Sequence, residues 1–338
     1  MKLFTFPDTS HYKSIETIDL HTAGEPLRVV TSGYPEIKGR TILEKRDYTS
    51  QHLDNLRRLI MLEPRGHADM YGALITEPER KDSDFGVLFI HNEGYSSMCG
   101  HGIIALLALS ALTDHTPRQI RIDSPAGVIC GYIGDKSAKQ PLSFENVPSF
   151  VDSINHQYSI DGVGAVTFDV AFGGAYYAFV DADELGLSLT PDNCAEVIRQ
   201  GKLITEFARE NVSVKHPQHE ELSFIYGTIF TSKTQITQGK HSRHACIFAD
   251  GELDRSPTGT GVSARAALLN YYGELDVGEQ ITLESIIATN MQVTIKEQLT
   301  WNGKAAISPL VSGSAVITGR HQFFLTHDDV IKDGFLLR

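Results

Sequence analysis

Short runs of β-branched and aromatic residues alternate with glycine and other turn-forming residues along most of the chain. Apolar runs bounded in this way are typical of β-strands. We therefore predict strands at residues 87–90, 128–130, 176–180, 228–231, 245–249 and 315–317. The pattern indicates a protein rich in sheet.

Helical periodicity is found in fewer places. Residues 47–62 have Leu53, Leu56 and Ile60 at helical spacing. Residues 192–211 show the same spacing and follow a Thr-Pro-Asp sequence of the kind that begins helices. Both segments are predicted to be helices.

Two further helices are predicted after a pair of similar loops. The first loop reads Cys-Gly-His-Gly at residues 99–102, and the second reads Thr-Gly-Thr-Gly at 258–261. The loops lie about half the chain apart, and strand-like runs precede them at 87–90 and 245–249. We interpret this as an internal duplication, although two Gly- and Ala-rich helix starts could also be similar by chance. The first helix, 103–112, is apolar on nearly every side, so we expect it to be buried.

The length of 338 residues suggests two domains. We expect an N-terminal domain of residues 1–160 that contains the Cys99 loop, with 322–338 as a candidate completion of it. Residues 161–321 would form the C-terminal domain, which contains the Thr258 loop.

The formal charge of −12 argues against nucleic acid or an anionic membrane as the main partner. It leaves an anionic small molecule open, because backbone N–H groups can make a site locally positive. The longest apolar run, 103–112, is too short to cross a bilayer. Residues 1–14 lack the apolar stretch of a signal peptide.

The cysteines have no zinc-type spacing, and we expect a reducing, cytoplasmic setting. They are Cys99, Cys130, Cys194 and Cys246. We expect all but Cys99 to be small buried apolar residues. His241 and His244 lie three residues apart, but no third metal ligand is evident, so we expect solvated surface histidines and no metal site. No dinucleotide or Walker motif is present in the sequence, and we expect no cofactor.

A glycine-rich turn at a helix start exposes unpaired N–H groups and the positive end of the helix dipole, which together favour an anion such as a carboxylate. The same environment lowers the pKa of a cysteine thiol, so we expect Cys99 to be partly thiolate near neutral pH. A thiolate beside a carboxylate site is suited to removing the proton from the carbon next to that carboxylate. A buried cysteine that only packs a helix start is the alternative for Cys99.

Five sequence blocks resemble the proline racemase family. They are Asp-Leu-His-Thr-Ala-Gly-Glu-Pro-Leu-Arg at 19–28, Glu-Pro-Arg-Gly-His-Ala-Asp-Met at 63–70, Met-Cys-Gly-His-Gly at 98–102, Phe-Asp to Gly-Gly at 168–174 and Asp-Arg-Ser-Pro-Thr-Gly-Thr-Gly at 254–261. The resemblance implies an α+β fold like that of diaminopimelate epimerase. In that fold, two pseudo-symmetric β-rich domains each wrap around a central helix, and the site lies between the helix starts. It also suggests a homodimer that binds a proline-like amino acid.

The resemblance also implies roles for individual residues. Racemases and epimerases of the family use two cysteines; Cys99 matches the first, and Thr258 stands in place of the second. Threonine at this position resembles the trans-3-hydroxy-L-proline dehydratase subgroup. Four residues are implied to bind the substrate carboxylate or lie beside it: Gly100, His101, Gly259 and Thr260. Asp254 would contact the ring nitrogen together with His101. We expect three residues of the first block to hold the loops in place: His21, Glu25 and Arg28.

A threonine hydroxyl is a poor acid or base near neutral pH, and no base is evident beside Thr258 in the sequence. We therefore expect a hydro-lyase in which Cys99 removes the α-proton of trans-3-hydroxy-L-proline, water departs, and Δ1-pyrroline-2-carboxylate forms. The alternatives are an isomerase such as a hydroxyproline 2-epimerase or proline racemase, and a non-catalytic binder of proline-like amino acids.

Overall fold

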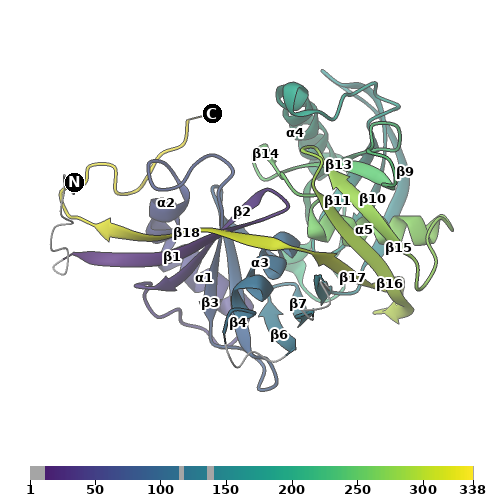
Figure 1. Ribbon diagram of the computed structural model, residues 1–338. Helices are drawn as coiled ribbons and strands as arrows, with labels where there is room; N and C mark the ends of the chain where they lie inside the picture. The colour runs from purple at the N-terminus through teal and green to yellow at the C-terminus, as the bar shows by residue number, and fades with distance from the viewer. Residues whose placement is uncertain (1–11, 114–117, 135–140, 338) are drawn as a thin grey trace.

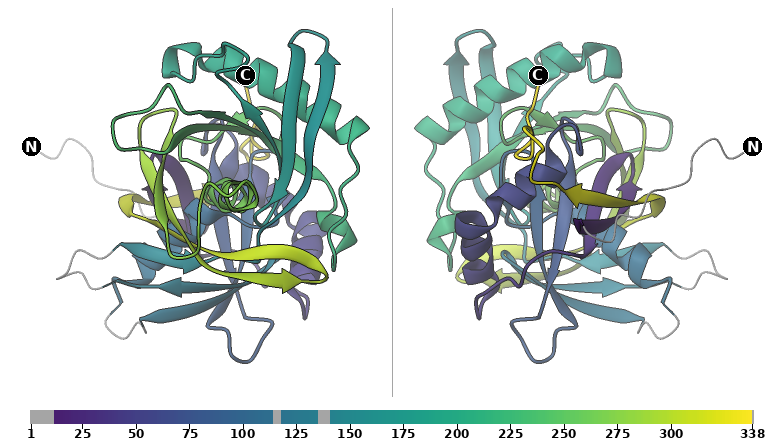
Figure 2. Two further views of the ribbon diagram at one scale, coloured as in Figure 1. Left: turned by 90° about the vertical axis from the view of Figure 1, so that its right-hand side faces the viewer. Right: turned by 90° about the vertical axis from the view of Figure 1, so that its left-hand side faces the viewer.

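The computed structural model describes residues 12–113, 118–134 and 141–337. They form a sheet-rich α+β fold, as predicted (Figure 1). Every strand from β1 to β18 belongs to one continuous sheet, which divides into two sets that each surround a helix. Figure 2 (left) looks along one of these helices and shows the strands around it.

The first set of strands surrounds α3 (Gly100–Ser110). It consists of β1 (Lys13–Thr22), β2 (Glu25–Ser32), β3 (Tyr71–Thr76), β4 (Phe85–His91), β5 (Tyr95–Ser96), β6 (Gln119–Ser124), β7 (Gly127–Tyr132), β8 (Leu142–Glu145) and β18 (Ala315–Leu325).

The second set surrounds α5 (Gly259–Tyr271). It consists of β9 (Phe150–Ile160), β10 (Gly164–Phe172), β11 (Tyr176–Asp181), β12 (Ile225–Ser232), β13 (Ser242–Phe248), β14 (Glu252–Leu253), β15 (Gln280–Ser285), β16 (Asn290–Trp301) and β17 (Lys304–Gly313). All six predicted strands lie in these two sets.

The two sets have the same topology. The first runs β18-β1-β2-β3-β4-β6-β7-β8, and the second runs β9-β10-β11-β12-β13-β15-β16-β17. The parallel pairs also correspond: β2–β3 matches β11–β12, and β4–β6 matches β13–β15. The β8–β17 pair joins the sets. This match confirms the internal duplication inferred from the two loops.

Strand pairing differs from the expected domain boundaries at two places. Strand β9 pairs with β10, so a boundary at residue 160 would divide a hairpin. Strand β18 pairs with β1 along its whole length, so residues 315–321 lie with the first set. We propose instead that the two units divide at residues 146–149 and near residue 314.

The core includes both central helices, because strands cover them on all sides. Ile103, Ile104 and Leu107 of α3 are fully buried, as their apolar surroundings in the sequence predict. The apolar run of β4 is buried on both faces. Val87 and Phe89 face the main core, whereas the intervening residues 88 and 90 face a second cluster.

The second cluster lies beneath two helices that the sequence predicted as one. Instead of a single helix at 47–62, α1 (Ile42–His52) and α2 (Asp54–Met61) meet at Leu53, which has non-helical backbone angles. The start of α1 is set by a capping box, in which Thr41 and Glu44 each bond to the backbone of the other.

The predicted helix at 192–211 is present as a short 3-10 turn (Pro191–Asn193) followed by α4 (Cys194–Asn211). A second 3-10 turn spans Glu220–Leu222. The prediction of two solvated histidines was wrong for His244, which is fully buried within β13. None of the helices in the described residues is long and apolar enough to cross a membrane.

Candidate active site between the central helices

The starts of the two central helices meet at the centre of the molecule. Cys99 is the N-cap of α3, and Thr258 is the N-cap of α5. A Cβ atom on Gly100 would lie 2.5 Å from the Cα of Gly259, and one on Gly259 would lie 2.6 Å from the Cα of Gly100. The backbones therefore touch, and only glycine allows this approach at both positions.

A small cavity lies at this junction. All seven residues selected from the sequence line it: Cys99, Gly100, His101, Asp254, Thr258, Gly259 and Thr260. The structure thus brings together residues that lie more than 150 positions apart in the chain.

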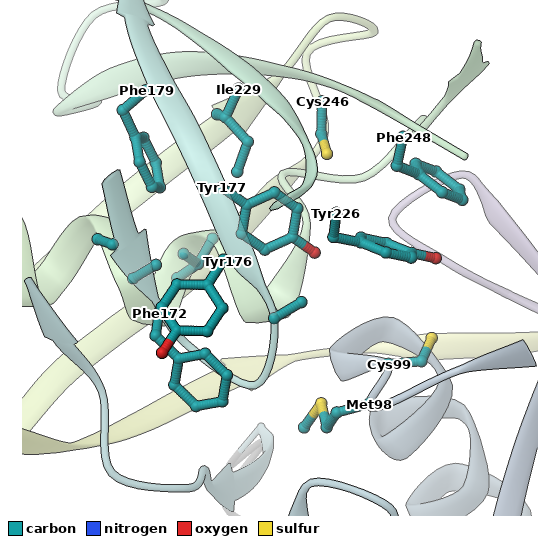
Figure 3. Close-up of a cluster of buried hydrophobic side chains, with 14 of the residues drawn as sticks. Met98, Cys99, Phe172, Tyr176, Tyr177, Phe179, Tyr226, Ile229, Cys246 and Phe248 are labelled. Carbon is teal, nitrogen blue, oxygen red and sulfur yellow. The ribbon is translucent and has the colours of Figure 1, made fainter. Parts of the chain in front are cut away.

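Five further residues line the cavity, and the sequence analysis assigned none of them to the site: Tyr71, Met98, Tyr177, Tyr226 and Phe248. Figure 3 shows the last three facing Met98 and Cys99 across the junction. The aromatic residues lie in or beside apolar strand runs, where an aromatic residue resembles a core residue. Of the five, Met98 has a local signal in the sequence, because it directly precedes Cys99.

The thiol of Cys99 lies beside hydrogen-bonding groups and near two carboxyl groups. Its Sγ accepts a hydrogen bond from the backbone N–H of Gly102 at 3.2 Å, and it lies 3.2 Å from Nδ1 of His101. Burial raises the pKa of the thiol well above its ordinary value, and the carboxylates of Asp254 and Glu25 raise it further, against the lowering effect of the Gly102 N–H. The expectation of a lowered pKa was wrong for this structure, because the loss of solvation outweighs the helix N-terminus.

His101 has the opposite shift. Burial lowers the pKa of its imidazole, although the nearby Asp254 carboxylate opposes this. The ring is therefore neutral near pH 7 and able to accept a proton. The backbone carbonyl of His101 accepts a hydrogen bond of 2.8 Å from the hydroxyl of Thr22, which holds the loop against β1.

Thr258 adopts a backbone conformation that is uncommon for a β-branched residue, with φ of 68°. Its hydroxyl donates to Oδ2 of Asp254 at 2.8 Å, and Oδ1 of the same carboxylate accepts the N–H of Ser256 at 2.7 Å. The sequence analysis found no base beside Thr258, and the structure places there the carboxylate of Asp254, four residues earlier in the same loop. A carboxylate is far too weak a base to deprotonate an alcohol, so this contact orients the hydroxyl rather than activating it.

The remaining loop residues are held by neighbouring strands. The hydroxyl of Thr260 shares a hydrogen bond of 2.7 Å with that of Tyr177 on β11.

Arg28 forms a buried ion pair of 2.8 Å with Asp19 and also donates to the carbonyl of Ile60. Arg28 is therefore engaged in the first strand set, away from the cavity.

Glu25 joins the two strand sets. Its Oε2 accepts the backbone N–H of Arg255 at 2.6 Å, and the guanidinium of Arg255 pairs with Asp69 at 2.6 Å. Burial raises the pKa of the Glu25 carboxyl well above its ordinary value, and Asp254 raises it further, whereas Arg255 lowers it. Nδ1 of His21 accepts the N–H of Gly24 at 3.3 Å, which closes the turn before Glu25. His21, Glu25 and Arg28 all lie outside the cavity lining.

The functional groups of the cavity are thiol, imidazole, carboxylate and hydroxyl groups beside two helix N-termini. Two opposed sets of backbone N–H groups suit a small carboxylate, and the thiol suits proton abstraction next to it. Among the described residues, no group of three His, Cys, Asp or Glu side chains could hold a metal ion.

Comparisons with known proteins agree with this architecture. A relative in Colwellia psychrerythraea, named trans-3-hydroxy-L-proline dehydratase, is 48% identical, over 97% of this chain and 94% of its own. A human protein of the same name is 40% identical, over 96% and 95%. The crystal structure of a hydroxyproline epimerase from Agrobacterium vitis with bound trans-4-hydroxy-L-proline has a TM-score of 0.87 and 26% identity, and the match covers 96% of both chains.

The family model described as proline racemase matches residues 17–336, which include every element of the site. Together with the full-length relatives, this match establishes that the chain belongs to the proline racemase family.

Proposed function

We propose that this chain is a trans-3-hydroxy-L-proline dehydratase, a hydro-lyase that forms Δ1-pyrroline-2-carboxylate without a metal or cofactor. The observation that supports it best is the unequal pair at the two helix starts. One has the Cys99 thiol, and the other has the Thr258 hydroxyl, which donates a hydrogen bond to Asp254. The names of the two relatives described above agree with this reaction.

Substrate binding follows from the two helix starts. We propose that the carboxylate is bound by the loop residues on both sides of the junction: Gly100, His101, Gly259 and Thr260. Backbone N–H groups held in this way stabilise negative charge that spreads into the carboxylate when the α-proton leaves. Asp254, with His101 beside it, would contact the positively charged ring nitrogen.

Cys99 is the proposed base. It acts as the thiolate, which forms when the thiol loses its proton to solvent, and Nδ1 of the neutral His101 imidazole lies 3.2 Å from its Sγ. The positive ring nitrogen of the substrate favours the thiolate, because it offsets the carboxylates that raise the thiol pKa in this structure. The thiolate then takes the α-proton, the 3-hydroxyl leaves as water, and the resulting enamine rearranges to the cyclic imine.

Thr258 is the proposed reason why the reaction is elimination and not racemisation. Racemisation needs a second acid–base group on the other face of the α-carbon, and a hydroxyl oriented toward Asp254 does not provide one near neutral pH. In trans-3-hydroxy-L-proline the hydroxyl and the α-hydrogen lie on the same face of the ring. One side of the site is therefore enough for the elimination.

Epimerisation is the second candidate, because the solved epimerase has the same fold over nearly the whole chain. The two reactions are separated by incubating the purified protein with trans-3-hydroxy-L-proline and, separately, with trans-4-hydroxy-L-proline. The proposal requires imine from the first substrate. Inversion of the second substrate without imine from the first would establish an epimerase, and binding without turnover of either would establish a non-catalytic binder.

We further propose that the protein acts in the cytoplasm as a homodimer on a small amino acid, without nucleic acid or membrane partners. The four free cysteines and the acidic composition are consistent with this setting. Light scattering of the purified protein tests the dimer, and a monomer mass would contradict it.

A further inference from the structure

Elimination of water needs a proton for the departing oxygen, because hydroxide is a poor leaving group. The proposed function gives Cys99 the α-proton but leaves the donor to the 3-hydroxyl open. For elimination from one face of the ring, this donor must lie on the same side of the substrate as Cys99. The hydroxyl groups that line the cavity are the natural candidates.

Three of these hydroxyls already form hydrogen bonds within the second strand set, which contains Thr258. The proton of Thr258 is directed to Asp254. The hydroxyls of Thr260 and Tyr177 bond to each other at 2.7 Å. The other two are the phenols of Tyr71 and Tyr226, which come from β3 and its counterpart β12.

Tyr71 belongs to the same strand set as Cys99. Its ring packs edge-on against the ring of His101, with centroids 4.9 Å apart, and its phenol lies close enough to Cys99 to lower the pKa of the thiol. The phenol is also hydrogen-bonded to the hydroxyl of Ser96, which lies behind it on β5. A proton donor, the base and a second hydroxyl are thus adjacent.

Tyr71 and its neighbour Tyr226 both suit the protonation of a leaving hydroxyl. Burial raises the pKa of Tyr71 well above the ordinary value, and Tyr226 and Cys99 raise it further, so the phenol keeps its proton near neutral pH. The phenol of Tyr226 also lines the cavity and lies close enough to Tyr71 to raise the pKa of that phenol. The two neighbouring phenols can therefore contact one polar group of a substrate in this cavity.

We infer that Tyr71 is the general acid that protonates the leaving 3-hydroxyl, and that Tyr226 binds the same hydroxyl. This inference rests on the proposed dehydration. The Cα–H bond breaks as its proton moves to Cys99, and its electron pair forms the Cα–Cβ double bond. The C–O bond breaks with its pair on oxygen, which takes the phenol proton and leaves as water. The Cys99 thiol then returns the proton to the Tyr71 phenolate, and both groups are restored.

The test compares two leaving groups on the same protein. Chloride needs no proton to depart, so trans-3-chloro-L-proline bypasses a general acid while it still needs Cys99. For Tyr71→Phe we expect kcat with trans-3-hydroxy-L-proline to fall by about 10²–10⁴-fold, the usual contribution of general acid catalysis. With the chloro substrate, kcat should fall by less than about tenfold, because loss of chloride does not need the general acid that the variant lacks. Imine formation is measured with o-aminobenzaldehyde and corrected for the uncatalysed rate.

Tyr176→Phe is the matched control, because it removes a buried phenol oxygen that has no hydrogen-bond partner in the described residues and lies outside the cavity. It should leave both rates unchanged. Tyr226→Phe should raise KM for the hydroxy substrate more than it lowers kcat. Replacing Tyr71 with 3-fluorotyrosine keeps the ring and the acidic hydroxyl, so kcat with the hydroxy substrate should stay within about tenfold of the wild-type value.

The outcomes separate the two proposals. Equal losses with both substrates, or no loss with either, would show that Tyr71 is not the acid. A wild-type protein that forms no imine from trans-3-hydroxy-L-proline would contradict the proposed function itself, and the inference with it. A fluorotyrosine protein that folds but is as inactive as Tyr71→Phe would also count against Tyr71, because it keeps the proposed acid.

Discussion

The hydroxyl of Thr258 donates a hydrogen bond of 2.8 Å to Oδ2 of Asp254, four residues earlier in the same loop. The side chain that we place opposite Cys99 is therefore fixed by its own half of the molecule. Because its proton is already directed to a carboxylate, we propose that Thr258 does not exchange protons with substrate.

This relationship leads to a prediction for Thr258→Cys. A thiol at this position would place an ionisable group on each face of the α-carbon, as two-base racemisation requires. We expect the variant to gain measurable epimerisation of trans-4-hydroxy-L-proline, followed by chiral chromatography, and to lose part of its dehydratase activity. Thr258→Ser, which keeps the hydroxyl, is the control and should gain none. If neither variant inverts the substrate, Thr258 does not face the second side of the α-carbon.

Removal of the proposed base is a second test. Cys99→Ser replaces the thiol with a much weaker acid, so turnover of trans-3-hydroxy-L-proline should fall by about 10²–10⁴-fold. Cys194→Ala is the matched control, because Cys194 is a half-buried free cysteine at the start of α4 and lies outside the cavity lining. It should keep most of the activity. Activity that survives in Cys99→Ser would show that another group is the base.

The raised pKa of Cys99 predicts an alkaline pH profile. Only the thiolate removes the α-proton, and a thiol whose pKa lies above its ordinary value is mostly protonated at neutral pH. The value of kcat/KM should therefore rise with pH from 7 to beyond 9, by close to tenfold per pH unit. A flat profile over this range would mean that the thiolate is already formed in the free protein.

Contact between the two helix starts predicts a strict need for glycine. In Gly259→Ala the new Cβ would lie 2.6 Å from the Cα of Gly100, so the helices must separate. We expect a loss of about 1–3 kcal/mol in the free energy of unfolding, typical of overpacking, together with a large fall in kcat/KM. Gly94→Ala is the control, because no atom lies within 4 Å of its added Cβ. Equal stability of the two variants in urea unfolding would contradict the contact.

The raised pKa of Glu25 predicts how the stability of the protein depends on pH. The carboxyl of Glu25 has a raised pKa in the folded protein. Its contribution to the free energy of unfolding is therefore fully present below its ordinary pKa of about 4.3, and it is lost as the pH rises through the raised pKa. Glu25→Gln stays neutral and still accepts the N–H of Arg255. The melting temperature of the variant relative to wild type should therefore increase as the pH is raised from 5 to 9. A constant difference would show that Glu25 ionises normally.

Features that depend on neighbours in sequence were largely predictable. The runs that became β4 and β11 are short and bounded by turns, and the x-Gly-x-Gly loops indicated the starts of α3 and α5. The break at Leu53 was missed because the helical periodicity continues across it, although the capping box at Thr41 could have corrected the start.

The sequence by itself determined the family, the duplication and the seven residues that line the junction, because these follow from local motifs and their repetition. Tertiary structure alone decided which aromatic side chains reach the cavity, since Tyr71 and Tyr226 lie in strand runs that resemble ordinary core. It also decided the direction of the Cys99 pKa shift. A helix start favours the thiolate locally, but burial among carboxylates from distant segments outweighs it, and that balance depends on how the two halves meet.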